Sequence, residues 1–417
     1  MDFDIIIAGA GPAGLSAAKE LSKWYRVLVI DPKSKPQTTA AWYSYNDRVD
    51  KYGLKSCVIR KCKSLIYKAM DLEHEMIDSM VVLDSLKVLQ LWHAQATANK
   101  TTFHKATLKD AVPITEGVLV TTDKQVYTAH LLIDCTGITS SILKKYGLIK
   151  HSNTWILAGG FISNIKLKDI DRLYFLPVND KRNTYIGLYP HSKTSADFYV
   201  FYNLNEEIGK FADIKSIFRK ALRKEYPCAR IKSPLLGRIV GGELTQYALD
   251  NIVFFGQSGM MDPPGCGMGF NEILLHHQVF AKNIHQCMIQ KTLDTNALSD
   301  AATAFRDPAI FQFQQIIAKY TYYFIFSPTK WRGGVAWLNA LGKESKHWMR
   351  NELTIPWIEN ASITLYNTIP ITDVIKLMPP KDYAFIIEHF AKFVGDAVFE
   401  ESAKAEEKYK RELISNQ

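Results

Sequence analysis

The feature that most constrains this chain is a glycine-rich loop set between two short apolar runs within residues 4–31. Residues 4–8 (DIIIA) are typical of a buried parallel strand. Residues 9–14 (GAGPAG) match the GxGxxG pattern, and residues 26–30 (RVLVI) predict a second strand that leads into Asp31. This order predicts a nucleotide pocket, because a helix N-terminus offers free N–H groups and partial positive charge to phosphates.

Each residue of the loop has a mechanical role in this interpretation. Gly9 allows the tight turn, Gly11 lets the backbone approach a pyrophosphate, and Gly14 lets the helix lie close to the sheet. Ala13 belongs to the same cofactor-binding loop. Asp31 follows Gly11 by twenty residues and can accept hydrogen bonds from an adenosine ribose, which favours FAD or NAD over NADP.

Two later segments distinguish between these dinucleotides. Residues 127–137 predict a strand that runs into an Asp-x-Thr-Gly turn, and residues 251–259 predict a strand that runs into a glycine turn. Residues 263–270 (PPGCGMGF) then lead into a predicted helix. Over about residues 1–290 this set resembles the flavoprotein hydroxylase superfamily, which includes aromatic hydroxylases, flavin halogenases, geranylgeranyl reductases and lycopene cyclases.

The resemblance implies FAD as the cofactor. It places further FAD contacts at eight positions: Thr136, Gly137, Gly256, Gln257, Gly265, Gly267, Met268 and Gly269. The aspartate that binds the ribityl chain in this superfamily falls on Gln257, which can accept a hydrogen bond but carries no charge. On this alignment, restoring the aspartate is expected to preserve or tighten FAD binding.

The pattern of elements predicts an α/β protein with a Rossmann-like FAD-binding domain of parallel strands. Residues 1–150 and 240–290 are expected to form this domain, interrupted near 40–80 by part of a substrate domain. Residues 151–239 are expected to form a mostly antiparallel substrate sheet, because strand-like runs alternate there with polar turns. Residues 291–417 are expected to be mainly helical.

Aromatic and apolar residues of the predicted substrate sheet suggest a branch of the superfamily. Residues 172–177 and 185–188 are similar to a segment of geranylgeranyl reductases, which implies a substrate wall at Tyr174, Leu176 and Tyr185. The stretch around Trp42 looks more like lycopene cyclases, but their acidic motif has no counterpart here. Trp42, Tyr174 and Cys266 are the candidates for a catalytic role, with ordinary packing as the alternative for each.

These observations lead us to expect an FAD-dependent oxidoreductase that reduces carbon–carbon double bonds of an apolar, isoprenoid or lipid-like substrate. A flavin-dependent monooxygenase, a non-redox cyclase-like enzyme and a degenerate FAD-binding protein stay open as alternatives. The reductant, NAD(P)H or a ferredoxin-like donor, is left open too.

Composition limits the partners and the compartment. The net charge of +9 is spread along the chain without a nucleic-acid-binding motif, so no nucleic acid partner is expected. A solvated basic surface and peripheral contact with a membrane stay open. The six cysteines show no CxxC pair, so we expect reduced thiols, a cytoplasmic location and no metal site.

Overall fold

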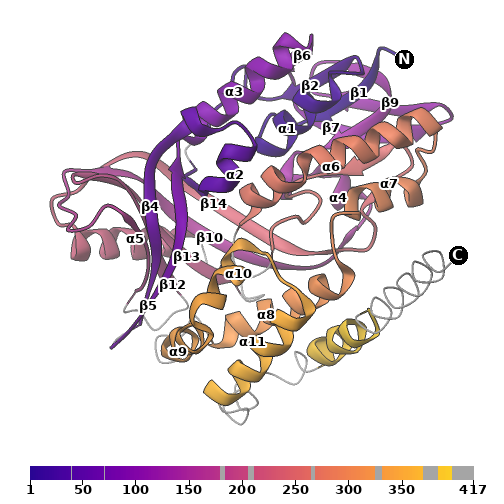
Figure 1. Ribbon diagram of the computed structural model, residues 1–417. Helices are drawn as coiled ribbons and strands as arrows, with labels where there is room; N and C mark the ends of the chain where they lie inside the picture. Colours follow the sequence, from indigo (N-terminus) through magenta and orange to yellow (C-terminus); the bar gives the residue numbers. More distant parts are fainter. Residues whose placement is uncertain are drawn as a thin grey trace, which may run out of the picture.

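The computed structural model describes residues 1–38, 40–69, 71–178, 184–204, 211–263, 268–324, 331–369 and 384–396. These residues form two sheets of eight strands each, with helices packed around them (Figure 1). One sheet carries the glycine-rich loop, and the other lies between a single helix and a group of helices late in the chain. We call them sheet A and sheet B.

Sheet A is built around the strand that precedes the loop, in the order β15-β16-β9-β1-β2-β6, with β8 beside β9 and β7 beside β8. Its strands are β1 (Phe3–Ala8), β2 (Val27–Asp31), β6 (Thr102–Lys105), β7 (Leu108–Ile114), β8 (Gly117–Thr122), β9 (Val126–Asp134), β15 (Ala248–Leu249) and β16 (Ile252–Phe254). β1 pairs in parallel with both β2 and β9. Ile5, Ile6 and Ile7 are fully buried, as expected for a parallel strand covered on both faces.

Helices early and late in the chain cover one face of sheet A (Figure 1). They are α1 (Pro12–Leu21), α3 (Ser85–Ala98), α6 (Gly269–Gln290) and α7 (Thr295–Thr303). Ala17 and Ala18 of α1 are fully buried in this layer, where their small side chains let the helix lie close to the strands. The short helices α2 (Asn46–Lys51) and α4 (Ser141–Lys145) complete this part of the chain.

Sheet B has the order β14-β10-β13-β12-β11-β4-β5-β3 and is antiparallel except where β11 meets β4. Its strands are β3 (Trp42–Tyr45), β4 (Val58–Ala69), β5 (Leu72–Leu83), β10 (Ile149–Ser163), β11 (Arg172–Pro177), β12 (Thr184–Ser192), β13 (Ser195–Leu204) and β14 (Arg230–Leu244). Three of its strands, β3, β4 and β5, come from residues 42–83. Most strands of sheet A follow them in the sequence.

The two faces of sheet B pack against different partners. One face meets α5 (Phe211–Glu225), and the other meets the helices that follow α7. β11 shows the alternation, because Leu173 and Phe175 join the second face, whereas Tyr174 and Leu176 pack against the first. This alternation decides which side chains of the sheet can face a ligand.

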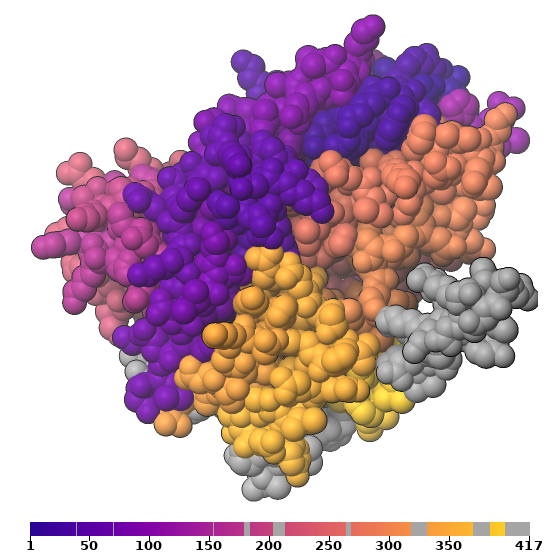
Figure 2. Space-filling model, in the orientation of Figure 1, coloured from indigo at the N-terminus to yellow at the C-terminus, as the bar shows by residue number. Residues whose placement is uncertain are grey.

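The later helices form a group beside sheet B, and two of them pack against β4 and β5. They are α8 (Pro308–Phe324), α9 (Trp331–Leu341), α10 (Ser345–Arg350), α11 (Ile355–Thr368) and a helix over 384–396. In Figure 2 their orange and gold surface abuts the purple surface of the N-terminal third of the chain. None of the helices in the described ranges is both long enough and apolar enough to cross a bilayer.

The α/β fold class with a parallel-rich sheet, an antiparallel-rich sheet and late helices is confirmed. Residues 230–244 form a long strand that the sequence pattern did not predict, because glycines and basic residues interrupt its apolar alternation. The domain limits themselves stay a prediction.

Candidate functional site

The glycine-rich loop lies at the carboxyl end of β1, where α1 begins. Gly9 has a φ of +105°, and a Cβ there would lie 2.4 Å from the carbonyl oxygen of Cys135. At Gly14 a Cβ would lie 1.8 Å from the carbonyl oxygen of Gly9. Gly11 differs, because its Cβ would meet no described atom within 4 Å beyond its chain neighbours. The loop is therefore tightly packed against the protein and open on the side that a phosphate would approach.

A cavity of about 340 Å³ extends from Gly9 and Gly11 past the end of β2. Asp31 lines it, with Oδ2 accepting from the Ala10 N–H at 2.8 Å and Oδ1 accepting from the Lys33 N–H at 2.8 Å. Thr136, at the end of β9, lines the same cavity. Each carboxylate oxygen can accept more than one hydrogen bond, so Asp31 can still bind a ribose hydroxyl.

A second cavity, of about 370 Å³, begins at the same loop and shares Gly11 and Cys135 with the first. It leads from α1 to the face of sheet B that the later helices cover. The aromatic residues that line it are Trp42, Tyr43, Tyr189, Tyr199, Phe201 and Phe270. Together the two cavities offer one polar end near Asp31 and one apolar end against sheet B.

Four predicted FAD contacts beyond Gly11 line this second cavity: Ala13, Gly137, Gln257 and Gly269. Gly256 supports the loop, because a Cβ there would lie 2.5 Å from the Cβ of Ala13. Met268 precedes α6 and is buried in the core cluster of sheet B. Gly265, Cys266 and Gly267 lie outside the described residues.

A buried carboxyl group stands next to Gln257. The Nε2 of Gln257 donates to Oδ2 of Asp262 at 2.9 Å, and the N–H of Gly269, the first residue of α6, donates to the same carboxyl group. Asp262 is only 4% exposed, and burial raises its pKa to about 6 in spite of these hydrogen bonds. The negative charge expected at position 257 is thus carried by position 262, at the N-terminus of α6.

Asp262 is the site residue that the sequence pattern missed. It precedes two prolines and therefore looks like a turn residue. The signal that could have identified it is its charge, because no other charged residue lies between the glycine turn and α6 in the sequence. The structure gives a reason to expect the opposite effect of Gln257→Asp on FAD binding. A carboxylate there would lose the donor to Asp262 and stand beside a second acid.

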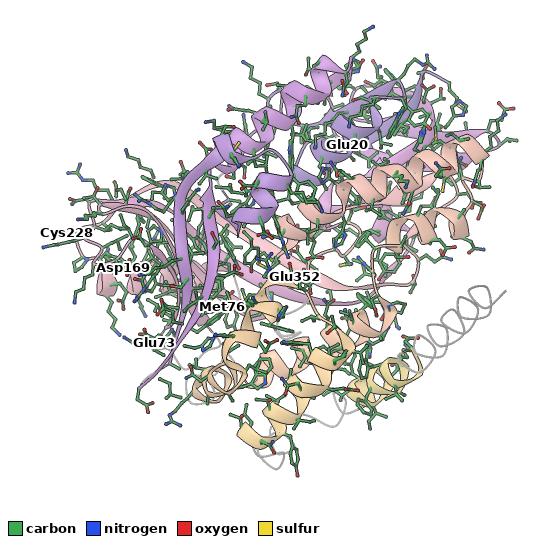
Figure 3. All side chains as sticks on the ribbon, in the orientation of Figure 1. Glu20, Glu73, Met76, Asp169, Cys228 and Glu352 are labelled. Atoms are coloured by element: carbon green, nitrogen blue, oxygen red, sulfur yellow. The ribbon has the colours of Figure 1, made fainter. Side chains whose placement is uncertain are left out.

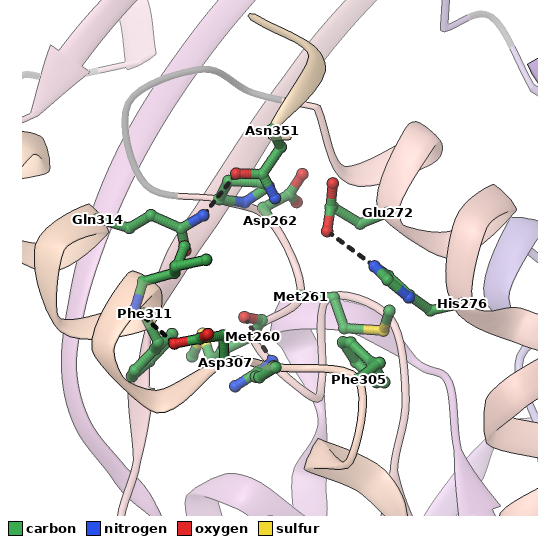
Figure 4. A pocket seen from close by; sticks show the side chains of 13 residues that line it. Met260, Met261, Asp262, Glu272, His276, Phe305, Asp307, Phe311, Gln314 and Asn351 are labelled. Carbon is green, nitrogen blue, oxygen red and sulfur yellow. Dashed lines mark hydrogen bonds and ion pairs between the residues drawn. The ribbon is translucent and has the colours of Figure 1, made fainter. Parts of the chain in front are cut away.

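A smaller cavity, of about 140 Å³, lies on the other side of Asp262 (Figure 4). Asp262 lines both this cavity and the apolar one. In Figure 4, Glu272 and His276 of α6 approach each other, with 3.4 Å between Oε2 and Nε2. Gln314 and Asn351 close another side through a hydrogen bond between their side chains. Asp262 therefore lies between the aromatic cavity and a smaller one whose wall mixes apolar and polar side chains.

The structure divides the predicted substrate residues. Trp42 lines the apolar cavity and stacks on Phe270, with ring centroids 4.3 Å apart. Tyr185 packs in the core on the cavity side of sheet B and stacks on Phe201 at 4.8 Å.

Tyr174 and Leu176 need correction, because they pack against the cluster beneath α5, on the opposite face. The wall of the cavity is formed instead by Leu157, Tyr189, Tyr199, Phe201 and Leu235.

Comparison with known proteins agrees with this arrangement of two sheets around a dinucleotide loop. Residues 4–157 match the family model described as lycopene cyclase protein. The capsanthin/capsorubin synthase of Capsicum annuum is 26% identical over 195 residues, which are 46% of this chain and 38% of that protein. A neoxanthin synthase of Solanum lycopersicum is 24% identical over 198 residues, 46% of this chain and 39% of that protein. The matches thus span about two fifths of each of these relatives.

Solved structures share the fold over a much larger part of the chain. A geranylgeranyl bacteriochlorophyll reductase-like protein from Thermoplasma acidophilum gives a TM-score of 0.71 at 13% identity, covering 90% of this chain and 99% of that one. A variant of the halogenase PltM in complex with FAD gives a TM-score of 0.69 at 12% identity, covering 94% of this chain and 97% of that one. Together the sequence and structure comparisons support the superfamily of FAD-dependent oxidoreductases that the motifs indicate.

Proposed function

We propose that this chain binds FAD across the two cavities and uses it to modify a carbon–carbon double bond of an apolar, isoprenoid-like substrate. The observation that supports this most directly is that the two cavities meet at Gly11 and Cys135, which line both of them. The polar end suits an adenosine and a pyrophosphate, and the aromatic end suits a flavin ring with an apolar substrate beside it.

The residues fit the cofactor. Gly11 leaves open space at the start of α1, where the helix N-terminus would hold the pyrophosphate, and Asp31 would accept from the ribose. Gln257 and the first turn of α6 would face the far half of the dinucleotide. Bound FAD would supply hydride chemistry, while the protein supplies shape, exclusion of water and charge.

The apolar cavity supports an apolar substrate. Trp42, Tyr199 and Phe201 present ring surface, which binds hydrocarbon at roughly 25 cal/mol per Å² of area removed from water. Arg238 is the basic residue that lines this cavity among the described residues, and it would suit an anionic head group. We favour reduction of the double bond as the reaction, with the electron donor still to be identified.

A cyclase-like reaction without net redox change is the second candidate, and Asp262 is the observation that favours it. Its carboxyl group lies in the apolar cavity with a pKa raised to about 6 by burial, so it holds a proton at a higher pH than an ordinary aspartate does. A carboxyl group of this kind can protonate a carbon–carbon double bond. The family match to lycopene cyclase protein over residues 4–157 agrees with this reading.

The mass of the product distinguishes these reactions. The protein is loaded with FAD, reduced anaerobically and incubated with prenyl lipids and carotenoid precursors, and the products are analysed by mass spectrometry. A gain of two hydrogens supports the reductase, and an unchanged mass with altered retention supports the cyclase. Small aromatic acids are offered in a parallel reaction, with O2 admitted after the flavin has been reduced. Turnover of these acids alone, with gain of one oxygen atom from O2, would contradict both and indicate a monooxygenase.

A further inference from the structure

We propose that His151, Glu243 and His389 form a binding site for one divalent transition-metal ion, of the class that includes zinc. The three side chains place one ligand atom each within 4.8 Å of one another. None of them lines the cavities of the dinucleotide site. The proposal therefore concerns a second site, independent of the proposed function.

Two of the three ligands are fixed by the register of sheet B. His151 on β10 and Glu243 on β14 are direct cross-strand partners, so their side chains emerge side by side on the same face. β14 ends the strand order of sheet B, so the pair lies at an edge. His389 comes from the helix over 384–396 and is 1% exposed, whereas the other two are half-buried.

Each histidine ring makes a hydrogen bond on the side that points away from Glu243. This bond sets which ring nitrogen faces the proposed ion. Nδ1 of His389 lies 2.9 Å from the carbonyl oxygen of Phe385, and Nε2 of His151 lies 2.9 Å from Oε1 of Gln315. Both partners are acceptors, so these nitrogens carry the protons and the opposite nitrogens present lone pairs. Metal-binding histidines are commonly oriented by an outer acceptor in this way.

The lone pairs converge on a carboxylate. Nδ1 of His151 lies 3.6 Å and Nε2 of His389 lies 3.7 Å from the same oxygen, Oε2 of Glu243. Nε2 of His389 is buried and has no hydrogen-bond partner. Acceptors that face one another inside a protein repel unless a proton or a cation lies between them, so the arrangement suits a bound cation.

Geometry and chemistry point to the zinc class. Tetrahedral zinc with ligands at about 2.1 Å separates its donors by roughly 3.4 Å, close to the two distances to Glu243. Two imidazoles favour zinc, cobalt, nickel or copper over magnesium and calcium, which prefer oxygen ligands. Three protein ligands leave a fourth position for water, and the ion would fasten the helix over 384–396 to the edge of sheet B.

A nearby lysine competes for the same carboxylate. Nζ of Lys150 lies 3.1 Å from Oε2 of Glu243 and 3.7 Å from Oε1 of Glu388, which also pairs with Lys392 at 2.7 Å. Lys150 is partly exposed and attached by a flexible stem, so it can move into solvent when an ion binds. A proton on His389 would be the other way to supply the missing positive charge.

The test is metal titration of the full chain without a histidine tag, after chelator treatment, in a Cys228→Ser background. Cys228 is an exposed thiol that could bind metal by itself, and Figure 3 shows it on the opposite side of the molecule from the C-terminal helices. We expect one equivalent of Co²⁺ with the intense visible absorption of a tetrahedral site, displaced by Zn²⁺. Zn²⁺ should also raise the melting temperature.

Matched variants separate the site from adventitious binding. His151→Gln, Glu243→Gln and His389→Gln should each weaken Co²⁺ binding at least tenfold, whereas the exposed His130→Gln should not. Lys150→Met keeps all three ligands and should tighten Co²⁺ binding several-fold. A gain in affinity cannot result from misfolding, so this variant tests the site even if the others fail to fold. Absence of stoichiometric Co²⁺, equal binding in the His130 and His389 variants, or weaker binding in Lys150→Met would overturn the proposal.

Discussion

Replacing Asp262 with asparagine is expected to stabilise the cofactor-free protein at neutral pH. The folded protein holds the proton of Asp262 up to a pKa of about 6, whereas the unfolded chain releases it near the ordinary aspartate pKa of 3.8. The folded state therefore loses stability relative to the unfolded state as the pH rises through this window. Asparagine is neutral at every pH and removes this loss.

The size of the effect follows from the two pKa values. A difference of 2.2 units between 6 and 3.8 corresponds to about 3 kcal/mol of unfolding free energy well above the window. About 2 kcal/mol of this falls between pH ~4.5 and pH ~7.5. Asparagine offers one acceptor oxygen to the donors at Gln257 and Gly269, which costs about 1 kcal/mol at both pH values.

Urea denaturation of both proteins at the two pH values measures this directly. The difference in unfolding free energy, asparagine variant minus parent, should increase by about 2 kcal/mol from the lower to the higher pH. Comparing differences cancels the titration of all other groups. A difference that stays constant within about 0.5 kcal/mol, or that decreases, would refute the assignment of a raised pKa to Asp262.

Three further predictions concern the cofactor and the substrate. Gly11→Val should abolish FAD binding while the melting temperature stays near that of the parent, because its side chain would enter open space rather than packed atoms; a variant that retains stoichiometric FAD would contradict the loop assignment. Gln257→Asp should weaken FAD binding at pH ~8, because it places a carboxylate beside Asp262. The double variant Gln257→Asp with Asp262→Asn should bind FAD as the parent does, as followed by flavin fluorescence, whereas tighter binding in the single variant would support the expectation from the sequence. Trp42→Ala should lower turnover at least tenfold with an unchanged flavin spectrum, whereas Tyr174→Ala should leave turnover within about twofold, since Tyr174 packs on the far face of sheet B; equal losses would place the substrate elsewhere.

The sequence was sufficient where the structure depends on neighbours along the chain. The loop between β1 and α1, with Asp31 at the end of β2, could be predicted because apolar runs and glycines determine it locally. Alternation along β11 predicted a strand but not which of its faces meets the cavity. Tyr174 was therefore placed on the wrong side.

Contacts between distant segments could not be predicted in the same way. Asp262 acquires its raised pKa from burial, and its partners Gln257 and Gly269 meet it only when the loop folds back on α6. His151 and Glu243 become neighbours through the pairing of β10 with β14, a strand whose pattern is masked by glycines and basic residues. Neither relation leaves a periodic signal in the sequence.

The way in which the two sheets alternate along the chain has a consequence for synthesis on the ribosome. β4 is synthesised well before its parallel partner β11. β9 is likewise synthesised before its partner β16, which follows all strands of sheet B in the sequence. Until residue 254 has emerged, the nascent chain carries strand edges that have no partner, and such edges pair readily with other chains. We expect fragments that stop near residue 150 to aggregate, and expression to depend on slow growth or on chaperones that shield these edges.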